Sequence, residues 1–517
     1  MKRFPPIVLL VCLLFLRVFS IEVYAQARLL STPSLKATTG DGQSQVPSNS
    51  VSQVVTRGTL LWIGTGKGAA RSSDGGRTFV SYRFVPQFAR PGIFAMDVKG
   101  DTVWCATGYV EQTEAAGSVQ TGAGYAYSFD NGATWHFASQ PLDAQSDSIV
   151  AYGANRIHFL PITVPEQNVT FRVVVTDSAA WVASWSSGLR KTTDNGTTWQ
   201  RFVLPSDSLS SISPNDSLSG YVVDPRLNNN FLLFSVYVES PSVVWAGSAG
   251  GINRSPDGGV SWSKFTSTNQ LNHVLANWVI AIRGQRRPAG TRIWTANWPA
   301  ATTGETYSVS CTDDSGQTWR NSLIGIKAYD FAFKDSIVYV GADEGLFRSS
   351  DGGVSWEMSG SIADQVSGNA ITSTAFFAAG TIADTLFAGN ADGLVRTTDN
   401  AANPFGEKWV VLRTSQPVGT PSATYSYPNP FSPRREIVRF HYNIGQPSTT
   451  VTIEVFDFGM NRIRTVVRDA PRAGAQERDE IWDGRDQTGS LVPNGVYFYR
   501  VTVGGGDPAW GKVMIIQ

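Results

Sequence analysis

The feature that most constrains this chain is an eight-residue pattern that returns along most of its length. The pattern reads [Ser/Thr]-x-Asp-x-Gly-x-[Thr/Ser]-aromatic, and its clearest copy is Ser349-Ser350-Asp351-Gly352-Gly353-Val354-Ser355-Trp356. An Asp two residues after a Ser or Thr can accept hydrogen bonds from its own turn, and Gly supplies the positive φ that closes the turn. We call this pattern the Asp turn. Six intact copies span 72–79, 128–135, 192–199, 255–262, 312–319 and 349–356, and a degraded seventh copy begins at 397.

A second repeated element, of the form apolar-aromatic-apolar-small, precedes each Asp turn and predicts a strand. In five repeats its aromatic residue lies 12 or 13 residues before the Asp, for example 74 − 62 = 12 and 194 − 181 = 13. In the second and fifth repeats the gap grows to 130 − 104 = 26 and 314 − 294 = 20. We expect the extra residues to form loops, which in repeat proteins often lie on the binding face. The aromatic residues are Trp62, Trp104, Trp181, Trp245, Trp294, Tyr339 and Phe387.

The spacing of the Asp turns predicts the architecture. Their mean step is (399 − 74)/6, about 54 residues, which is enough for one four-stranded blade of 40 to 50 residues with some surplus in loops. The sequence therefore predicts an all-β chain with a seven-bladed β-propeller over 51–412. Two ways of closing the ring stay open: the last sheet is complete by itself, or a strand from the leader completes it.

The Asp turn resembles the Asp-box (BNR) repeat of sialidase-like β-propellers. This resemblance implies that each turn is a structural hairpin between the third and fourth strands of a blade, on the face opposite the active site. It therefore implies structural and not catalytic roles for seven residues, which are Asp74, Asp130, Asp194, Asp257, Asp314, Asp351 and Asp399.

The Asp turns stop before a linker at 413–426, and a second domain is predicted over 427–517. Its segments Pro428-Asn429-Pro430-Phe431 and Asn494-Gly495-Val496-Tyr497-Phe498-Tyr499 resemble two overlapping families. One is the Ig-like domain of flagellar hook-capping proteins, and the other is the C-terminal type A sorting domain of the type IX secretion system. The resemblance implies a small Ig-like β-sandwich that is either read by secretion machinery or serves as a module that binds or spaces something.

The N-terminus predicts export. Met1-Lys2-Arg3 is a charged segment, and the apolar run at 4–16 is too short to span a bilayer. We expect a signal peptide over 1–25 and a flexible leader over 26–50, and hence a secreted or outer-surface protein, reached through the periplasm, without a membrane span after cleavage. Lys and Arg together number 42, as do Asp and Glu, so the chain offers no basic field for nucleic acid.

The residues that could carry chemistry are few. The four histidines have no metal-ligand spacing, and Gly64-Thr65-Gly66-Lys67-Gly68 lacks the ending of a phosphate-binding loop. No metal or other cofactor is therefore predicted. A glycoside hydrolase would need two acids facing each other across the pore. The weak candidates are Glu111 and Glu114 in the second repeat and Glu305 in the fifth, and a single sequence does not separate them from solvated loop charges.

Of the five tryptophans that the two repeated elements do not account for, two occupy equivalent positions in their repeats. Trp185 lies four residues after Trp181, and Trp298 lies four after Trp294, where the second strand enters its loop. By the geometry of the family, that loop is on the face away from the Asp turns. Exposed aromatics there could bind a sugar or a protein. Alternatively, they cap the core at the strand ends.

Two functional hypotheses follow. The first is a secreted, non-catalytic propeller that binds a glycan or an extracellular protein. Its ligand face would lie at 108–124 and 298–306, with Trp185 and Trp298 on the rim. Residues 427–517 would be recognised by the secretion machinery. The alternative is a polysaccharide-active glycoside hydrolase of the sialidase-like propeller type. Sialidases carry an early Arg-Ile-Pro motif, and this chain has only Arg83-Phe84-Val85-Pro86.

Overall fold

The computed structural model describes residues 46–83, 85–90, 92–113, 117–300, 304–365, 370–413, 424–444, 448–473 and 477–517. These residues divide into two compact units, one ending at residue 413 and the other beginning at 424. Apart from one short 3-10 helix, η1 (Asn229–Phe231), the regular structure described is all strand. The predicted all-β class is therefore confirmed. Within the described residues, no helix is long and apolar enough to cross a membrane.

The first unit contains seven antiparallel sheets in chain order, which we number sheet 1 to sheet 7. Each is a meander in which neighbouring strands follow one another in the sequence. Sheets 1 to 3 consist of β1 (Val51–Arg57), β2 (Leu60–Thr65), β3 (Gly68–Ser72) and β4 (Val80–Tyr82); of β5 (Gly92–Lys99), β6 (Thr102–Thr113), β7 (Gly117–Ser128) and β8 (His136–Ala138); and of β11 (Thr170–Val175), β12 (Ala180–Ser184), β13 (Gly188–Thr192) and β14 (Gln200–Arg201).

The remaining sheets follow the same plan. Sheets 4 to 7 consist of β17 (Leu233–Val238), β18 (Val244–Ser248), β19 (Gly251–Ser255) and β20 (Trp262–Phe265); of β21 (Trp278–Arg287), β22 (Gly290–Trp298), β23 (Ser308–Thr312) and β24 (Arg320–Ser322); of β25 (Ala328–Lys334), β26 (Ile337–Ala342), β27 (Gly345–Ser349) and β28 (Glu357–Met358); and of β29 (Phe376–Ile382), β30 (Thr385–Asn390), β31 (Leu394–Thr398) and β32 (Trp409–Leu412). Strand β15 (Ser211–Ile212) extends sheet 4, and β9 (Ile149–Tyr152), β10 (Asn155–Phe159) and β16 (Val222–Val223) form a separate small sheet.

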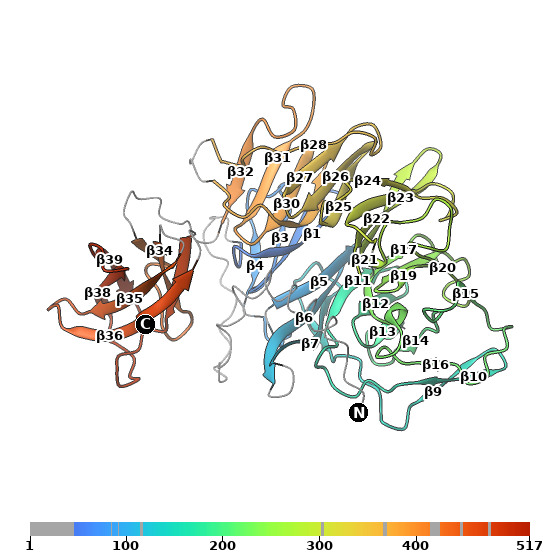
Figure 1. The fold of residues 1–517 in the computed structure, drawn as a ribbon, viewed down its shortest axis with the longest axis horizontal. Helices are drawn as coiled ribbons and strands as arrows, with labels where there is room; N and C mark the ends of the chain where they lie inside the picture. The colour runs from blue at the N-terminus through green and yellow to red at the C-terminus, as the bar shows by residue number, and fades with distance from the viewer. Residues whose placement is uncertain are drawn as a thin grey trace. The chain divides into compact units, whose positions relative to one another are not determined.

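The first strands of the seven sheets form a closed ring. Strand β1 contacts β5, and the series continues through β11, β17, β21 and β25 to β29, which contacts β1 again. Figure 1 shows the first sheet, in blue, beside the last sheet, in orange. This arrangement is a β-propeller, with the first strand of each sheet innermost.

Packing between neighbouring sheets explains why the residue after the apolar-aromatic-apolar run is small. A β-carbon placed at Gly389 would lie 2.6 Å from the Val51 side chain, and one at Gly64 would lie 2.7 Å from that of Ile93. In both cases the contacted residue belongs to the inner strand of the next sheet in the ring. The small residue lets that inner strand approach, so the repeat in the sequence is a packing requirement between sheets.

Each intact Asp turn is closed by its own hydrogen bonds. In the copy at 349–356, the Ser349 hydroxyl donates to Asp351 Oδ1 at 2.8 Å, and the Gly353 N–H donates to Ser349 Oγ at 2.7 Å. The Ser355 hydroxyl donates to the same carboxylate at 2.6 Å. The corresponding hydroxyl bond recurs in the other five intact copies. Their carboxylates are therefore used within the turns.

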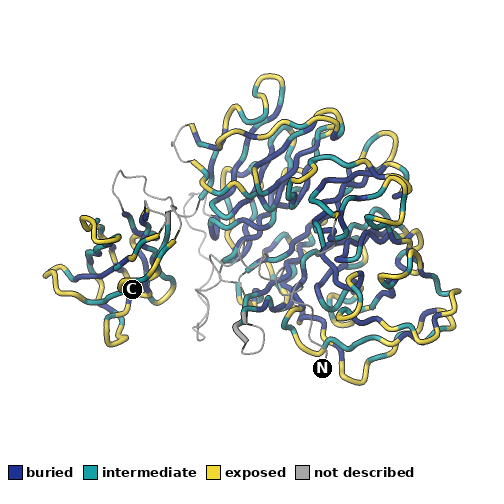
Figure 2. The backbone as a smooth tube through the Cα atoms, in the orientation of Figure 1, coloured by how far each residue is buried: buried dark blue, intermediate teal, exposed yellow. Residues whose placement is uncertain are grey.

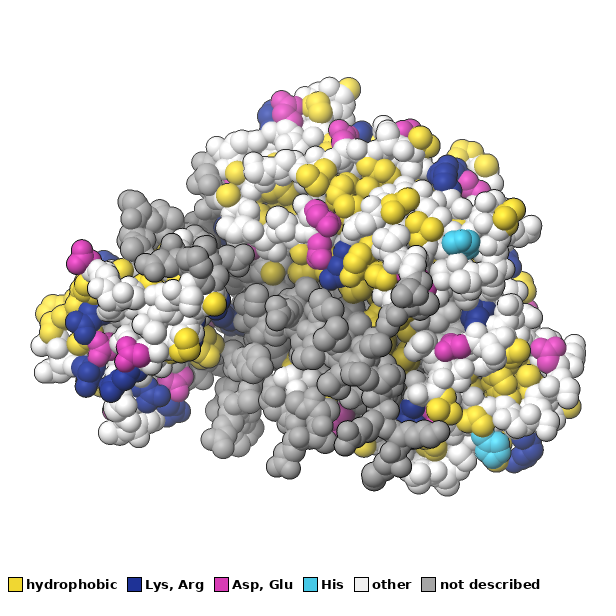
Figure 3. Space-filling view, in the orientation of Figure 1, with side chains coloured by type: hydrophobic (Ala, Val, Ile, Leu, Met, Phe, Trp, Pro, Cys, Tyr) yellow, Lys and Arg dark blue, Asp and Glu magenta, His cyan; other side chains and the backbone are white. Residues whose placement is uncertain are grey.

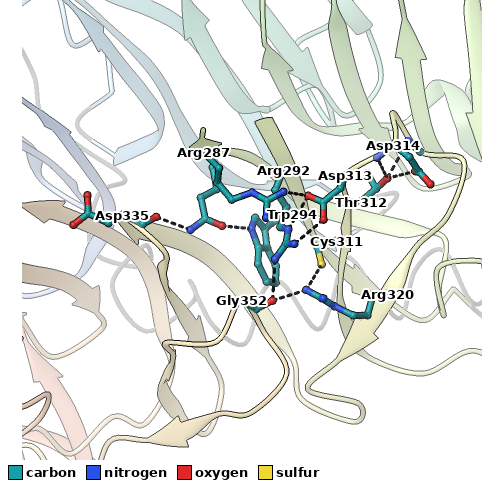
Figure 4. Close-up of polar contacts among 12 residues, drawn as sticks. Arg287, Arg292, Trp294, Cys311, Thr312, Asp313, Asp314, Arg320, Asp335 and Gly352 are labelled. Atoms are coloured by element: carbon teal, nitrogen blue, oxygen red, sulfur yellow. Dashed lines mark hydrogen bonds and ion pairs between the residues drawn. The ribbon is translucent and has the colours of Figure 1, made fainter. Parts of the chain in front are cut away.

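The aromatic residue and the backbone of the Asp turn also hold the preceding sheet. Trp356 packs edge-to-face on Trp294 of sheet 5, with ring centroids 6.2 Å apart. Arg292 donates to the Gly352 carbonyl at 3.0 Å, and Arg320 donates to the same oxygen (Figure 4). One turn thus closes its own hairpin and joins two sheets.

The degraded turn differs from the intact ones. Tyr339 and Arg348 of sheet 6 donate to the Asp399 carboxylate, the latter through Nε at 2.5 Å, and the residue is buried. Without the Gly and the second hydroxyl residue, its own turn offers this carboxylate fewer donors. Asp399 therefore bonds across the border between sheets 6 and 7 and not within its own turn.

The ring closes by packing and not by strand exchange. All four strands of sheet 7 come from 376–412 and all four of sheet 1 from 51–82. Their border, which we call the seam, is an apolar cluster that includes Val51, Leu61, Phe387 and Leu394. Arg396 donates to the Gly75 carbonyl at 2.7 Å, just as Arg71 of sheet 1 donates to that of Asn131 in sheet 2.

Part of the expected leader also belongs to the seam. Val46 is fully buried in the same apolar cluster, and Ser48 is buried beside it in the sequence. The expectation of a flexible leader as far as residue 50 is therefore wrong for 46–50, because apolar packing holds this segment. The signal peptide and the rest of the leader lie outside the described residues.

The Asp turns make the first unit sensitive to acid. The hydroxyl and N–H of Thr134 lower the pKa of Asp130 to about 2, and those of Thr198 do the same for Asp194. Because both carboxylates titrate lower in the folded chain than the usual value near 3.9, their stabilisation is complete above about pH 4 and is lost as the pH falls toward 2.

We therefore expect the Tm of the protein to fall between pH 4 and pH 2. Thermal melts followed by circular dichroism would measure it. A variant with Asp130→Asn, Asp194→Asn and Asp351→Asn should melt lower at pH 6 and lose less Tm on acidification. An equal loss in the variant and the wild type would contradict this role of the carboxylates.

The second unit has two sheets around one core. The first contains β33 (Thr424–Tyr427), β34 (Val438–Asn443) and β37 (Glu477–Trp482), and the second contains β36 (Arg462–Ala473), β35 (Ser448–Phe456), β38 (Gly495–Val503) and β39 (Ala509–Ile515). Phe440 of one sheet stacks on Tyr499 of the other with centroids 4.2 Å apart. Both residues lie in a single buried cluster with Trp482. In both units the buried positions follow the strands and the exposed ones gather at the turns (Figure 2).

Candidate functional site

Every inner strand of the propeller carries an irregularity near its start. In sheet 1 the pairing with β2 passes from Val51 directly to Gln53, so one residue is skipped, and the same shift occurs in the other six sheets. Such a β-bulge turns the skipped side chain out of the regular alternation. We call the skipped residues the bulge residues; they are Ser52, Phe94, Phe171, Phe234, Ile280, Tyr329 and Phe377.

All seven bulge residues line one cavity with a volume of about 100 Å³. Since this cavity touches the innermost strand of every sheet, it lies at the centre of the ring. The other lining residues are Gln53, Arg172, Ala281, Arg283, Trp298, Lys327 and Asp330. We call it the central cavity.

The central cavity lies on the face opposite the Asp turns. Its lining residues come from the beginnings of the inner strands, for example Phe94 in β5 and Phe377 in β29. In an antiparallel meander, the end of the first strand and the end of the third lie on the same side. The Asp turns follow the third strands, so the starts of the inner strands are on the other side, together with the ends of β6 and β22 and the starts of β7 and β23.

The ligand face proposed from the sequence is built differently from the expectation. We expected the extra residues of the second repeat to form a loop, but 108–113 and 117–124 continue the paired strands β6 and β7. The segment at 165–168 supports this hairpin, since the Gly122 N–H donates to the Pro165 carbonyl at 3.1 Å and that of Gln167 to the Gln120 carbonyl at 2.8 Å. The described part of the insertion is therefore a regular hairpin, held by its own strand pairing and by the backbone hydrogen bonds to 165–168.

Five of the bulge residues are aromatic and form what we call the aromatic collar: Phe94, Phe171, Phe234, Tyr329 and Phe377. Two pairs are in ring contact across sheet borders. The centroids of Phe171 and Phe234 are 5.6 Å apart, and those of Tyr329 and Phe377 are 5.2 Å apart. Ring faces and edges at this spacing suit a small apolar group.

Trp185 and Trp298 are not exposed on the rim, so that expectation is wrong. Their exposed fractions are 8% and 5%. Trp185 packs against Phe234 with centroids 5.1 Å apart, and Trp298 donates from Nε1 to the Ala328 carbonyl at 2.7 Å. Both rings back the aromatic collar, and Trp298 also lines the cavity. Their assignment as ligand-binding residues stays a prediction.

The charged side chains in and near the cavity include two ion pairs and one arginine outside them. Arg283 lies 2.6 Å from Asp330, and Arg57 lies 3.0 Å from Asp97. Arg172 lies near both pairs, but its Nε is buried without a hydrogen bond, and no ion pair to it forms among the described residues. Burial lowers the pKa of Arg172 to about 10, so the guanidinium keeps its charge at neutral pH. The cavity therefore contains one arginine without a counter-charge.

The two described acids among those selected from the sequence, Glu111 and Glu305, have partners outside the cavity. Glu305 accepts hydrogen bonds from Asn277 at 2.5 Å, from Ser267 at 2.9 Å and from the Ala300 N–H at 2.7 Å. Glu111 accepts one from the Tyr109 hydroxyl at 3.3 Å. Neither lines the cavity. Glu114 lies outside the described residues.

Asp330 is the one carboxylate among the described residues that line the central cavity. Its partner Arg283 already compensates its charge. In the part of the chain that the structure describes, no group of three His, Cys, Asp or Glu side chains is placed to hold a metal ion. On the face drawn in Figure 3, charged side chains of both signs are interspersed and form no single-sign field.

The bulge residues were missed from the sequence although a signal for them exists. In five repeats the bulge residue lies ten residues before the second-strand aromatic: 62 − 52, 104 − 94, 181 − 171, 339 − 329 and 387 − 377. A period search anchored on the second strand would have found a position there that is aromatic in four of these five repeats. What the sequence does not show is that the strand skips these residues and turns them inward.

Comparison with known proteins gives structural likenesses only. No protein-family model matches the sequence, and neither does a curated protein. Solved structures do match: YCF48 from Cyanidioschyzon merolae, with 16% identity, 68% of this chain and 96% of that chain covered and a TM-score of 0.42; PorZ, a surface component of the type IX secretion system of Porphyromonas gingivalis, with 13% identity, 93% and 67% covered and a TM-score of 0.36; and a GH74 enzyme from Niastella koreensis, with 14% identity, 91% and 85% covered and a TM-score of 0.25. At these values the likenesses carry no functional argument.

Proposed function

We propose that the protein is a secreted or cell-surface β-propeller that binds a glycan or an extracellular protein without turning it over. The observation that carries this proposal is the paired state of Asp330, the single carboxylate among the described lining residues of the central cavity. Retaining and inverting glycosidases need two carboxyl groups flanking the scissile bond, roughly 5 to 10 Å apart. The described lining of the cavity offers one carboxylate, and Arg283 compensates its charge.

The aromatic collar supports binding. Ligand sites are concave, mostly apolar and aromatic, and carry a few fixed polar groups. The lining of the central cavity has this composition, since five aromatic residues stand beside Gln53, Arg172 and the Arg283–Asp330 pair. The resemblance to Asp-box propellers, whose Asp turns face away from the ligand, points to the same side of the ring.

A panel of immobilised glycans and extracellular proteins, read alongside fluorogenic glycosides, tests the proposal. We expect retention of one class of ligand on the panel and no glycoside turnover. The variants Glu111→Gln and Glu305→Gln serve as controls, and both should retain that ligand. Turnover that either variant abolishes would replace the binding function with a hydrolase.

The second unit would serve as the export address, as its resemblance to type IX sorting domains implies. We expect a chain lacking 424–517 to pass the inner membrane and to accumulate in the periplasm. Because the second unit has its own core, the truncated propeller should still melt cooperatively, which separates a sorting defect from misfolding. Secretion of the truncated chain at the level of the full chain would show that the unit is not an address.

A further inference from the structure

Several apolar side chains that the second unit leaves exposed lie on one face of its larger sheet. Successive side chains of a strand point to opposite faces, and Tyr499 and Val513 point into the core. The positions that alternate with the core residues of β35, β38 and β39 form what we call the outer face: Glu454, Phe456, Val496, Phe498, Arg500, Trp510, Lys512 and Met514. Val496, Trp510 and Met514 are exposed there, so within the described chain this apolar surface is uncovered.

The turn between β35 and β36 adds two more apolar side chains next to the outer face. Phe458 and Met460 have exposed fractions of 79% and 52%. The Asp457 carboxylate accepts the Asn461 N–H at 2.8 Å, and the Asp457 carbonyl accepts the Met460 N–H at 3.0 Å. The centroid of the Phe458 ring lies 6.1 Å from that of Phe498. A turn held by its own hydrogen bonds therefore presents two apolar side chains to solvent.

Apolar and charged side chains are separated along the strands of the outer face. The turn at 457–461 follows the end of β35, which pairs with the start of β38, and the start of β38 pairs with the end of β39. Val496 and Met514 form one of these last pairs, so they lie at the same end of the sheet as the turn. We call these two residues, together with Phe458 and Met460, the apolar tip.

The part of the outer face next to the apolar tip is basic. The Glu454 carboxylate accepts hydrogen bonds from Arg462 Nη1 at 2.9 Å and from Arg500. The Arg500 guanidinium also lies 5.5 Å from the centroid of the Trp510 ring. One carboxylate between two guanidiniums leaves a positive charge, and Lys512 adds another on the same face. We call Arg462, Arg500, Trp510 and Lys512 the basic band.

We propose that the second unit docks on the surface of an anionic lipid bilayer, with the apolar tip in the acyl boundary and the basic band at the headgroups. Exposed apolar side chains enter the acyl boundary of a bilayer, whereas Trp and the long cationic side chains favour its headgroup region. The positive charge of the basic band complements anionic headgroups. This inference goes beyond the proposed function, which concerns the ligand of the propeller.

The order of the groups along the face favours a bilayer over a protein partner. The interface of two proteins has an apolar centre enclosed by a polar rim. In the second unit the most exposed apolar side chains, Phe458 and Met460, lie in a turn at the end of the sheet, and the cations follow along the strands. Such a gradient matches the boundary between hydrocarbon and headgroups, which a turn can enter without a rearrangement of the sheet.

Vesicles of equal parts phosphatidylglycerol and phosphatidylcholine test the docking by co-sedimentation. The full chain should bind them, and it should bind pure phosphatidylcholine vesicles roughly tenfold more weakly, because these lack the negative surface potential. In the double variant Phe458→Ser and Met460→Ser, binding to the mixed vesicles should fall roughly 30-fold or more, because two apolar side chains no longer enter the acyl boundary.

Two further variants separate the contributions of charge and apolar contact. Lys512→Gln should weaken binding to the mixed vesicles severalfold and leave binding to pure phosphatidylcholine unchanged. Leu227→Ser is the matched control, since Leu227 is an exposed apolar residue of the propeller, and it should bind as the wild type does. All these side chains are exposed, so each variant should melt like the wild type.

A dye at the tip reports insertion directly. The two free cysteines of the described chain are buried, so an environment-sensitive dye can be attached to the new thiol of Phe458→Cys. With mixed vesicles its emission should shift to the blue, and quenchers carried on the lipid chains should quench it. The same dye on Leu227→Cys should not respond. Adsorption by charge alone would leave both dyes unchanged and would overturn the insertion.

Other results would also overturn the inference. They are no sedimentation of the full chain with the mixed vesicles, and equal binding by the double variant. Dimers of the full chain that the double variant abolishes, without vesicle binding, would assign the face to a second copy. Loss of secretion in the double variant, again without vesicle binding, would assign it to a protein of the export machinery. Each of these results leaves the proposed function of the propeller standing, because the ligand panel tests the other unit.

Discussion

Replacement of Phe387 by alanine is expected to lower the free energy of unfolding by about 3–5 kcal/mol, the usual cost of deleting a fully buried Phe. Phe387 is completely buried at the seam and lies against Gly76, where an added β-carbon would be 2.8 Å from its ring. No strand of sheet 1 pairs with a strand of sheet 7 among the described residues. Apolar packing therefore carries most of the closure.

Urea unfolding measures the loss, and hydrogen exchange locates it. In Phe387→Ala, exchange should rise most in β1 and β29, which meet at the seam. Phe347→Ala is the matched control, since Phe347 is buried at the border of sheets 5 and 6, and its effect should stay away from β1. A loss below about 1 kcal/mol, or exchange raised equally in all sheets, would refute closure by packing.

Removing two rings of the aromatic collar is expected to weaken ligand binding roughly 30- to 700-fold. The double variant Phe94→Ala and Phe377→Ala loses two of the five collar rings that line the cavity. Apolar contacts of a ring are worth about 1–2 kcal/mol each when the ligand covers the ring partly, and 1.4 kcal/mol is a factor of ten. The ligand retained on the panel is the probe, and its Kd is the quantity measured.

Phe129 provides the control for this double variant. It is an aromatic residue with 47% of its surface exposed, and it belongs to an Asp turn on the opposite face. Phe129→Ala should leave the Kd unchanged. Both variants must retain the cooperative melt of the wild type, since Phe94 and Phe377 are only partly buried. An unchanged Kd in the double variant, or a loss in Phe129→Ala, would place the ligand elsewhere.

Local chemistry made the propeller predictable from the sequence. An Asp turn needs only its own eight residues to form, so Ser349, Asp351 and Gly353 reveal it without any knowledge of the neighbours. The small residue two positions after the second-strand aromatic likewise reflects a contact with the neighbouring sheet, as at Gly64 and Gly389. Because these local signals recur along the chain, together they predict the propeller architecture.

The parts that were missed depend on contacts between sheets. Trp185 and Trp298 lie at the end of a second strand, but their burial depends on Phe234 and Tyr329 from neighbouring sheets. The unpaired state of Arg172 depends on two aspartates being taken by other arginines. Neither the burial of the two tryptophans nor the unpaired state of Arg172 can be predicted from the residue spacing within one repeat.

The same holds for the closure of the ring. Residues 46–48 look like the end of a polar leader in the sequence, yet Val46 is buried in the seam beside residues more than 300 positions later in the chain. Asp399 has the sequence context of a turn residue, but Tyr339 and Arg348 of sheet 6 take its carboxylate.

A hydrogen-exchange footprint of the retained ligand tests most directly whether the bulges of the inner strands build the binding site. The account predicts protection on binding at the starts of the inner strands, around 92–95, 170–172 and 376–378, and no change at the Asp turns. Protection confined to the Asp turns, or to the second unit, would contradict it.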